Sequence, residues 1–115
     1  MRKAMGMWRE RITATSSGTS HTMYSESVSE GERWFLQRVS VRDDTTSGAS
    51  CLVSIDAGTH VHPLHLFSGL TANVESDAEI QCWLRESERL HFAWSGVAAN
   101  DKLYVHVTGH KQSAD

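Results

Sequence analysis

The sequence of 115 residues contains one proline, two cysteines and eight glycines. So little proline and glycine excludes collagen-like chains and proline-rich disordered chains. Because no run of about 20 apolar residues occurs, we expect no membrane-spanning helix and no membrane partner. A basic excess is missing as well, since the formal net charge is −3 with the histidines neutral. Without a basic stripe on the chain, we expect no nucleic-acid partner.

A secretory leader is not expected either, because residues 1–11 carry positive charge without an apolar stretch. Synthesis in a cytoplasm is therefore the expected origin. Cys51 and Cys82 both fall on the apolar phase of expected strands. Buried thiols behave as small hydrophobic side chains, and a cytoplasm favours free thiols. A disulfide between neighbouring strands stays open, because spacing does not decide it.

What the chain does contain is β-strand patterning, from residue 30 to residue 109 with short polar breaks. Alternation of apolar and polar residues, or density in β-formers, marks 33–42, 50–56, 79–85, 90–95 and 102–109. Period-2 patterning buries every second side chain, and strands about ten residues apart are typical of sandwiches and barrels. Weaker candidates lie at 7–15, 19–25, 59–67 and 70–74.

We therefore predict an all-β fold, a single two-sheet antiparallel β-sandwich spanning residues 1–115. About eight strands in a jelly-roll-like arrangement fit the pattern. Residues 1–7 are expected as an N-terminal arm and 110–115 as a C-terminal tail. Within 33–42 the apolar phase changes near Gln37 and Arg38, which predicts a β-bulge. Pro63 makes 59–67 an edge strand or an ordered loop.

The sharpest local motif is the histidine cluster at 60–65. His60 and His62 face the same way on a strand and can chelate one metal, with His106 as a candidate third ligand. The pair is similar to a cupin metal site, yet Leu66 and Phe67 stand where cupins carry a glutamate. We expect no cofactor and no metal. A metal-dependent cupin-like enzyme using His60 and His62 is kept as the second alternative.

No catalytic residue is predicted. Serines and histidines are plentiful, but no nucleophile elbow or catalytic cysteine signature occurs. The acidic pairs Asp43–Asp44 and Glu86–Glu88 lie in expected loops, where such pairs are usually solvated turns.

The four tryptophans are Trp8, Trp34, Trp83 and Trp94. Trp34 and Trp94 fit core positions, whereas Trp83 lies on the polar phase of its strand. An outward tryptophan anchors an interface or stacks against a sugar, unless a neighbouring loop covers it.

The segment 29–41, with Gly31, Trp34 and the alternating strand after them, resembles a known opening. It is similar to the start of small β-sandwich structural proteins of tailed bacteriophages. The likeness extends to a Thr/Ser/Ala-rich loop (43–49), a strand ending in glycine (50–58), an acid-plus-Leu segment (86–90) and a last strand ending Val-x-Gly (103–109). The resemblance implies a virion component without catalytic activity.

We therefore expect a non-enzymatic virion structural protein of a tailed phage or prophage. It would be a capsid decoration, head-spike base, head–tail or tail accessory protein, located in the virion after synthesis in the host. Self-association and binding to another capsid or tail protein are expected, because one repeated interface builds closed rings. The predicted contact residues are Trp8, Asp43, Asp44 and Trp83. A carbohydrate-binding module with Trp83 against a surface glycan is the first alternative.

Overall fold

The computed structural model describes residues 4–114, with side chains from residue 6 onward. This part of the chain forms strands and no helix, so no helix is present in it that could cross a membrane. The eight strands are β1 (Ala4–Thr15), β2 (Ser20–Tyr24), β3 (Glu32–Asp43), β4 (Ser50–Asp56), β5 (Val61–Phe67), β6 (Ser76–Leu84), β7 (Arg89–Ser95) and β8 (Lys102–Ser113).

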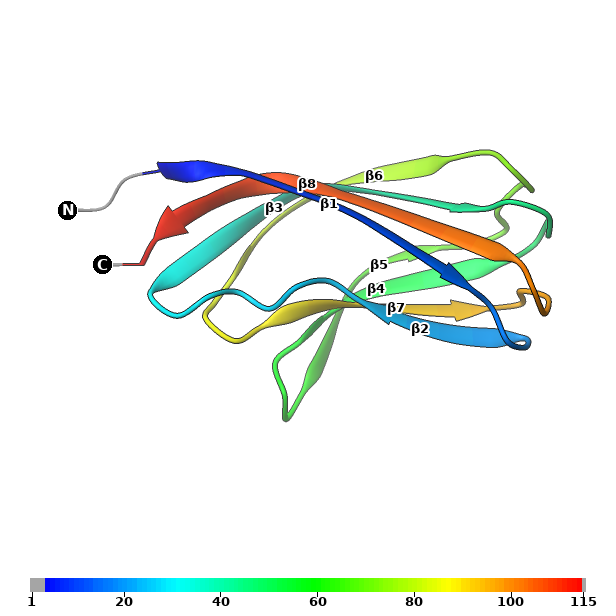
Figure 1. Cartoon of the computed structure of the whole chain (residues 1–115), viewed down its shortest axis with the longest axis horizontal. Helices are drawn as coiled ribbons and strands as arrows, with labels where there is room; N and C mark the ends of the chain where they lie inside the picture. Colours follow the sequence, from blue (N-terminus) through cyan, green and yellow to red (C-terminus); the bar gives the residue numbers. More distant parts are fainter. Residues whose placement is uncertain (1–3, 115) are drawn as a thin grey trace.

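The strands form two four-stranded antiparallel sheets that lie face to face (Figure 1). Sheet A has the order β1-β8-β3-β6, and sheet B has the order β2-β7-β4-β5. This is the two-sheet strand order of a jelly roll. The predicted β-sandwich of about eight strands is thereby confirmed.

The core fills the space between the two sheets. The core is built from side chains that alternate along the strands. On β7, Leu90, Phe92 and Trp94 point inward and are at most 2% exposed, while the residues between them face outward. Sheet A contributes a second set of fully buried side chains, among them Trp8, Trp34, Leu36, Val39, Val41, Leu84, Leu103, Val105 and Val107. A single apolar layer therefore joins both sheets.

The β-bulge predicted in β3 is confirmed. The register with both neighbouring strands shifts between Leu36 and Arg38, which leaves Gln37 without a cross-strand partner. Gln37 and Arg38 are both exposed, and Val39 returns to the core. The extra residue is the reason why the apolar side chains on the two sides of the bulge all reach the same core.

Two predicted end segments need correction. Positions 4–7, placed in an N-terminal arm, belong to β1, and the predicted tail is part of β8 up to Ser113. β1 and β8 stabilise each other at these ends, because their antiparallel pairing extends to Ala4 opposite Gln112. Residues 1–3 and 115 lie outside the described part of the chain.

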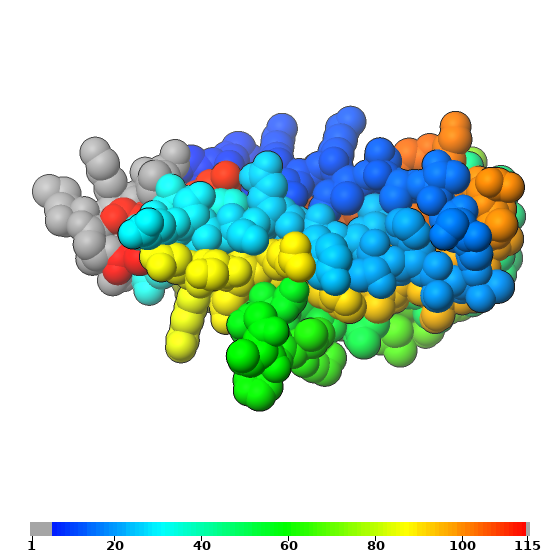
Figure 2. Space-filling model, turned by 60° about the horizontal axis from the view of Figure 1, so that its bottom comes forward, coloured from blue at the N-terminus to red at the C-terminus, as the bar shows by residue number. Residues whose placement is uncertain are grey.

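Segment 70–74 is a turn rather than a strand, since Leu70 exchanges backbone hydrogen bonds with the loop before β4. β5 is one of the two edge strands of sheet B and carries Pro63, as an edge strand allows. The β4–β5 hairpin projects from the body of the sandwich (Figures 1 and 2).

Candidate interaction surfaces

An aromatic cluster lies on the outer face of sheet A. The rings of Phe35 and Trp83 have centroids 4.9 Å apart, and Phe35 and His110 are 5.2 Å apart. Trp83 is 40% exposed, so it points outward as its phase predicts. The guanidinium of Arg33 lies over the Trp83 ring, 4.5 Å from its centroid. One face of this indole is therefore already covered by a cation of the same chain.

The same sheet face is hollowed further along. A hollow with a volume of about 410 Å³ lies over β1, β8 and β3. Arg42 stacks on Tyr104 at its wall, with the guanidinium 4.2 Å from the ring centroid. Its lining combines two guanidinium groups, an imidazole, one carboxylate and hydroxyls, namely Arg11, Arg42, His106, Glu75, Thr13, Ser40 and Tyr104. Such a lining suits a polar ligand with several hydroxyl groups or charges.

Three carboxyl groups meet where the loop after β3 touches the loop before β8. Candidate ligand oxygens of Asp43, Asp44 and Asp101 all lie within 4.8 Å of one another. Asp101 accepts hydrogen bonds from the hydroxyls of Thr45 (2.6 Å) and Thr46 (2.5 Å) and from the Ala98 N–H (3.0 Å). The three acids thus fasten two loops to each other.

The pKa values of the two buried members of this group are shifted in opposite directions. Burial opposes the charge of Asp101, but the Thr45 and Thr46 hydroxyls and the Ala98 N–H outweigh it and hold its pKa well below the usual value. Burial raises the pKa of Asp43, and the Thr45 and Thr46 N–H groups oppose this only in part. The nearby Asp101 raises it further.

Two predicted contact residues are in the wrong place for contact. Trp8 is 1% exposed, since its ring packs on Trp34 with centroids 5.0 Å apart and its Nε1 donates to Glu10. Asp43 is 0% exposed, because its Oδ1 accepts the N–H groups of Thr45 and Thr46 at the start of the loop. Of the predicted contact residues, Trp83 is exposed and Asp44 is half-buried.

The histidine candidates are not gathered into a metal site. The ring centroids of His60 and His62 are 5.9 Å apart on the exposed β4–β5 hairpin. His60 lies in the turn before β5, and His62 lies on β5 in sheet B. His106 lies on β8 in sheet A. Among described residues, the three aspartates are the only group of three potential ligands in reach of one ion.

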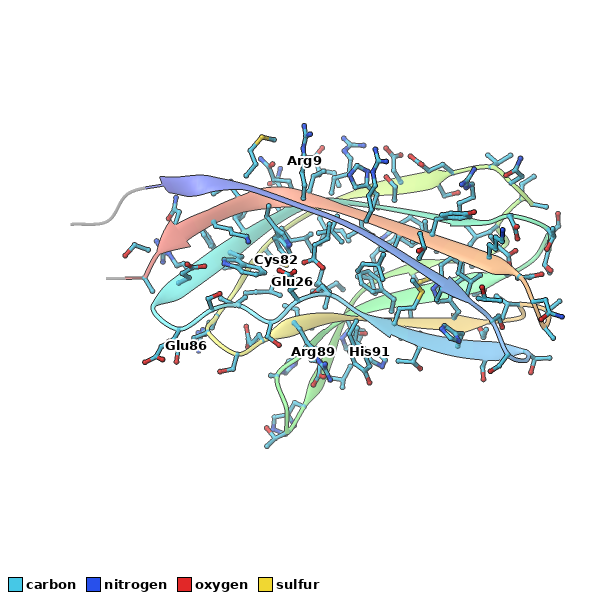
Figure 3. The ribbon with its side chains drawn as sticks, viewed as in Figure 1. Arg9, Glu26, Cys82, Glu86, Arg89 and His91 are labelled. Atoms are coloured by element: carbon cyan, nitrogen blue, oxygen red, sulfur yellow. The ribbon has the colours of Figure 1, made fainter. Side chains whose placement is uncertain are left out.

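The outer face of sheet B carries a smaller polar cluster (Figure 3). The Arg89 guanidinium lies 3.7 Å from the Tyr24 ring centroid and bonds Asp56 at 3.1 Å. The Gly58 N–H and then Arg89 lower the pKa of Asp56. His91 stands beside Tyr24, with ring centroids 5.3 Å apart. These contacts tie β2, β7 and β4 together on the outside of the sheet.

Asp101 was not predicted from the sequence as part of a site. An aspartate before a strand is an ordinary turn signal, and nothing local shows that this turn meets the loop at 43–46. The two edges of sheet A also differ in charge, with Arg9 and Arg11 on β1 and Asp77 and Glu79 on β6. This difference was not predicted, because it depends on the order of the strands.

Comparison with known proteins supports the fold and does not give a family. No family model matches the chain, and no curated protein sequence does. Among solved structures, a Bacillus endospore appendage protein that forms disulfide-linked pili is 16% identical, with a TM-score of 0.54 over 93% of this chain and 85% of that one. A chain from infectious bursal disease virus is 10% identical, with a TM-score of 0.52 over 97% of this chain and 32% of that one.

A family 29 carbohydrate-binding module is also similar in fold. It is 9% identical, with a TM-score of 0.52 over 96% of this chain and 81% of that chain. At such low identities the likeness extends to the sandwich fold alone.

Proposed function

We propose that this protein is a non-enzymatic structural subunit of a tailed-phage or prophage virion, which associates with its own copies and binds another capsid or tail protein. The observation that carries the proposal is the position of the exposed apolar side chains. Five of the six large ones described, Met7, Tyr24, Val61, Leu66 and Trp83, lie on the four edge strands.

Edge strands are where a sandwich meets a neighbour. Each presents unpaired backbone groups on one side, and apolar side chains beside them favour pairing with another chain. β5 shows this most strongly, since Val61 and Leu66 are each more than half exposed. The central strands β8, β3, β7 and β4 carry none of the six. The apolar surface is therefore placed for lateral assembly.

The virion assignment is supported by the resemblance of segments 29–41 and 103–109 to phage structural proteins. It is also consistent with the fold, because jelly rolls are common in viral capsids. The similar chains from infectious bursal disease virus and from endospore pili are parts of large assemblies. No catalytic role is assigned to any described residue.

The proposal is tested by measuring the mass of the purified full chain by light scattering over a wide concentration range, followed by negative-stain imaging. We expect symmetric oligomers or short filaments, and binding to purified phage heads or tails. Genes for portal, capsid or tail proteins beside the coding sequence would agree with this. A monomer at every concentration that binds no phage particle would contradict the proposal.

Glycan binding is the second candidate function, and the hollow on the outer face of sheet A favours it. Tyr104 and several hydroxyl and charged side chains line this space. Trp83 is a weaker sugar platform, because Arg33 covers one face of its ring. A glycan array probed with the wild type and with Tyr104→Ala tests this candidate. A signal that the substitution abolishes supports it, and no signal from the wild type removes it.

A further inference from the structure

The two edges of sheet A are matched to each other. Cross-strand rows run over the outer face from β1 through β8 and β3 to β6. On β1, three successive rows begin at Met7, Arg9 and Arg11. The same rows end on β6, in the same order, at Trp83, Glu79 and Asp77. Each row thus has an apolar residue at both ends, or a cation at one end and an anion at the other.

The charges at the two edges are available for a partner. Arg9 and Arg11 are exposed and form no ion pair with another described residue; Figure 3 shows Arg9 extending away from the outer face of sheet A. On the opposite edge, Arg38 bonds Asp77 at 2.6 Å and lies 3.9 Å from Glu79. Arg38 is therefore the cation near both exposed carboxylates, and the single positive charge leaves the β6 edge with a net negative charge.

The inner sides of the same edges are incompletely covered. On β1, Ile12 and Ala14 pack against the core but stay partly exposed. On β6 the same holds for Ala78, Ile80 and Cys82. A neighbouring strand at each edge would remove this apolar surface from water, which is favourable.

The strand directions allow the two edges to pair. Every neighbouring pair in sheet A is antiparallel, so β1 and β6, three strands apart, run in opposite directions. When β6 of one copy lies beside β1 of the next, the antiparallel alternation continues and the outer faces stay on the same side.

We infer that copies of this chain join head to tail, with β6 of one copy paired with β1 of the next in the register that places Arg9 opposite Glu79. This inference rests on the proposed self-association and gives it an interface. The contact sets Arg9 against Glu79 and Arg11 against Asp77, and Met7 then lies opposite Gln81, two residues along β6 from Trp83. Because it joins two different edges, it is heterologous, and it builds a ring where the rotation closes and a filament where it does not.

Charge reversal at one row tests the contact. Arg9→Glu and Glu79→Arg each place like charges opposite each other, so each variant alone should associate about tenfold more weakly than the wild type. An equimolar mixture of the two variants should assemble again. In an alternating array the glutamate at position 9 of one variant lies opposite the arginine at position 79 of the other, and Arg9 of the second variant lies opposite Glu79 of the first, so every contact joins opposite charges. Glu30→Arg, a reversal in an exposed loop, is the matched control and should assemble as the wild type does.

The measurements are sedimentation velocity for assembly and thermal unfolding for the integrity of each variant. If the wild type stays a monomer, both the proposed self-association and this interface are overturned. If the wild type assembles and the single reversals assemble equally well, the β1–β6 contact is overturned while self-association stands. If the mixture of folded variants does not recover, the pairing of Arg9 with Glu79 is overturned.

Discussion

Gly109 on β8 lies directly against the backbone of Phe35 on β3. A Cβ atom at Gly109 would overlap the Phe35 carbonyl oxygen and would lie 3.2 Å from a ring carbon of Trp8. The contact is next to the β3 bulge, where Leu36 is opposite Gly109. A glycine is therefore needed at this position for close approach of the strands, rather than for an unusual φ.

Gly109→Ala should destabilise the protein by about 3 kcal/mol, because the strand must shift away from the carbonyl it overlaps. Urea unfolding followed by tryptophan fluorescence measures the change. Gly18→Ala is the matched control, since no atom lies within 4 Å of a Cβ there, and its effect should be small. Equal stability of the two variants would contradict the close approach.

Asp101→Asn should cost about 1–3 kcal/mol, because the amide removes charge-assisted hydrogen bonds to the Thr45 and Thr46 hydroxyls. Asp43→Asn should change stability by less than about 1 kcal/mol. Its amide oxygen still accepts the two N–H groups of the loop, and its amide nitrogen can fill the place of the Asp43 Oδ2, which is buried without a hydrogen-bond donor. Thermal unfolding at neutral pH compares the two, and the opposite order would contradict the assigned roles.

The same pair predicts how stability changes with pH. The pKa of Asp101 is lowered by folding, so its contribution is complete above the unfolded value of about 3.9 and is lost as the pH falls toward the folded value. The pKa of Asp43 is raised by folding, so its contribution to stability depends on pH in the opposite direction. That contribution is complete below about 3.9 and is lost as the pH rises from there through the folded value. Unfolding from pH 2 to pH 7 should show a shallower acid loss in Asp101→Asn. An unchanged acid slope would show that Asp101 titrates normally.

The two cysteines should differ in reactivity. Cys51 is fully buried, and burial raises its thiol pKa to about 12. Cys82 is half-buried, and burial, followed by the charge of Glu88, raises its thiol pKa above the ordinary value. A disulfide-exchange reagent at pH 8 should therefore label at most one thiol in the folded chain and both after unfolding. Cys82→Ser should remove the label of the folded state, and rapid labelling of two thiols would contradict the burial of Cys51.

Trp8 and Trp83 should contribute very different amounts to the free energy of unfolding. Trp8→Ala should cost about 3–5 kcal/mol, as a large cavity would open beside Trp34. Trp83→Ala should cost less than about 1 kcal/mol, since an exposed side chain loses little on truncation. Chemical unfolding of both variants at one low protein concentration makes the comparison. A Trp83 variant that unfolds as readily as the Trp8 variant would place Trp83 in the core.

Much of the fold could be predicted because alternation is a local property. The change of phase at Gln37 predicted the bulge, and Pro63 predicted an edge strand or an ordered loop, since both depend on a few neighbouring residues. Trp8 was misplaced because the short segment around it gives no sign of its partner. The long pairing with β8 makes it part of sheet A and turns its ring into the core.

By itself, the sequence determined the all-β class, the approximate strands and the face of each strand that is buried, because a period of two fixes side-chain direction along an extended backbone. Only the tertiary structure decided which strands are neighbours and which are edges. That choice depends on contacts between residues far apart in the chain, and it is what brings Asp101 to Asp43. It also places Arg9 and Glu79 at opposite ends of one row.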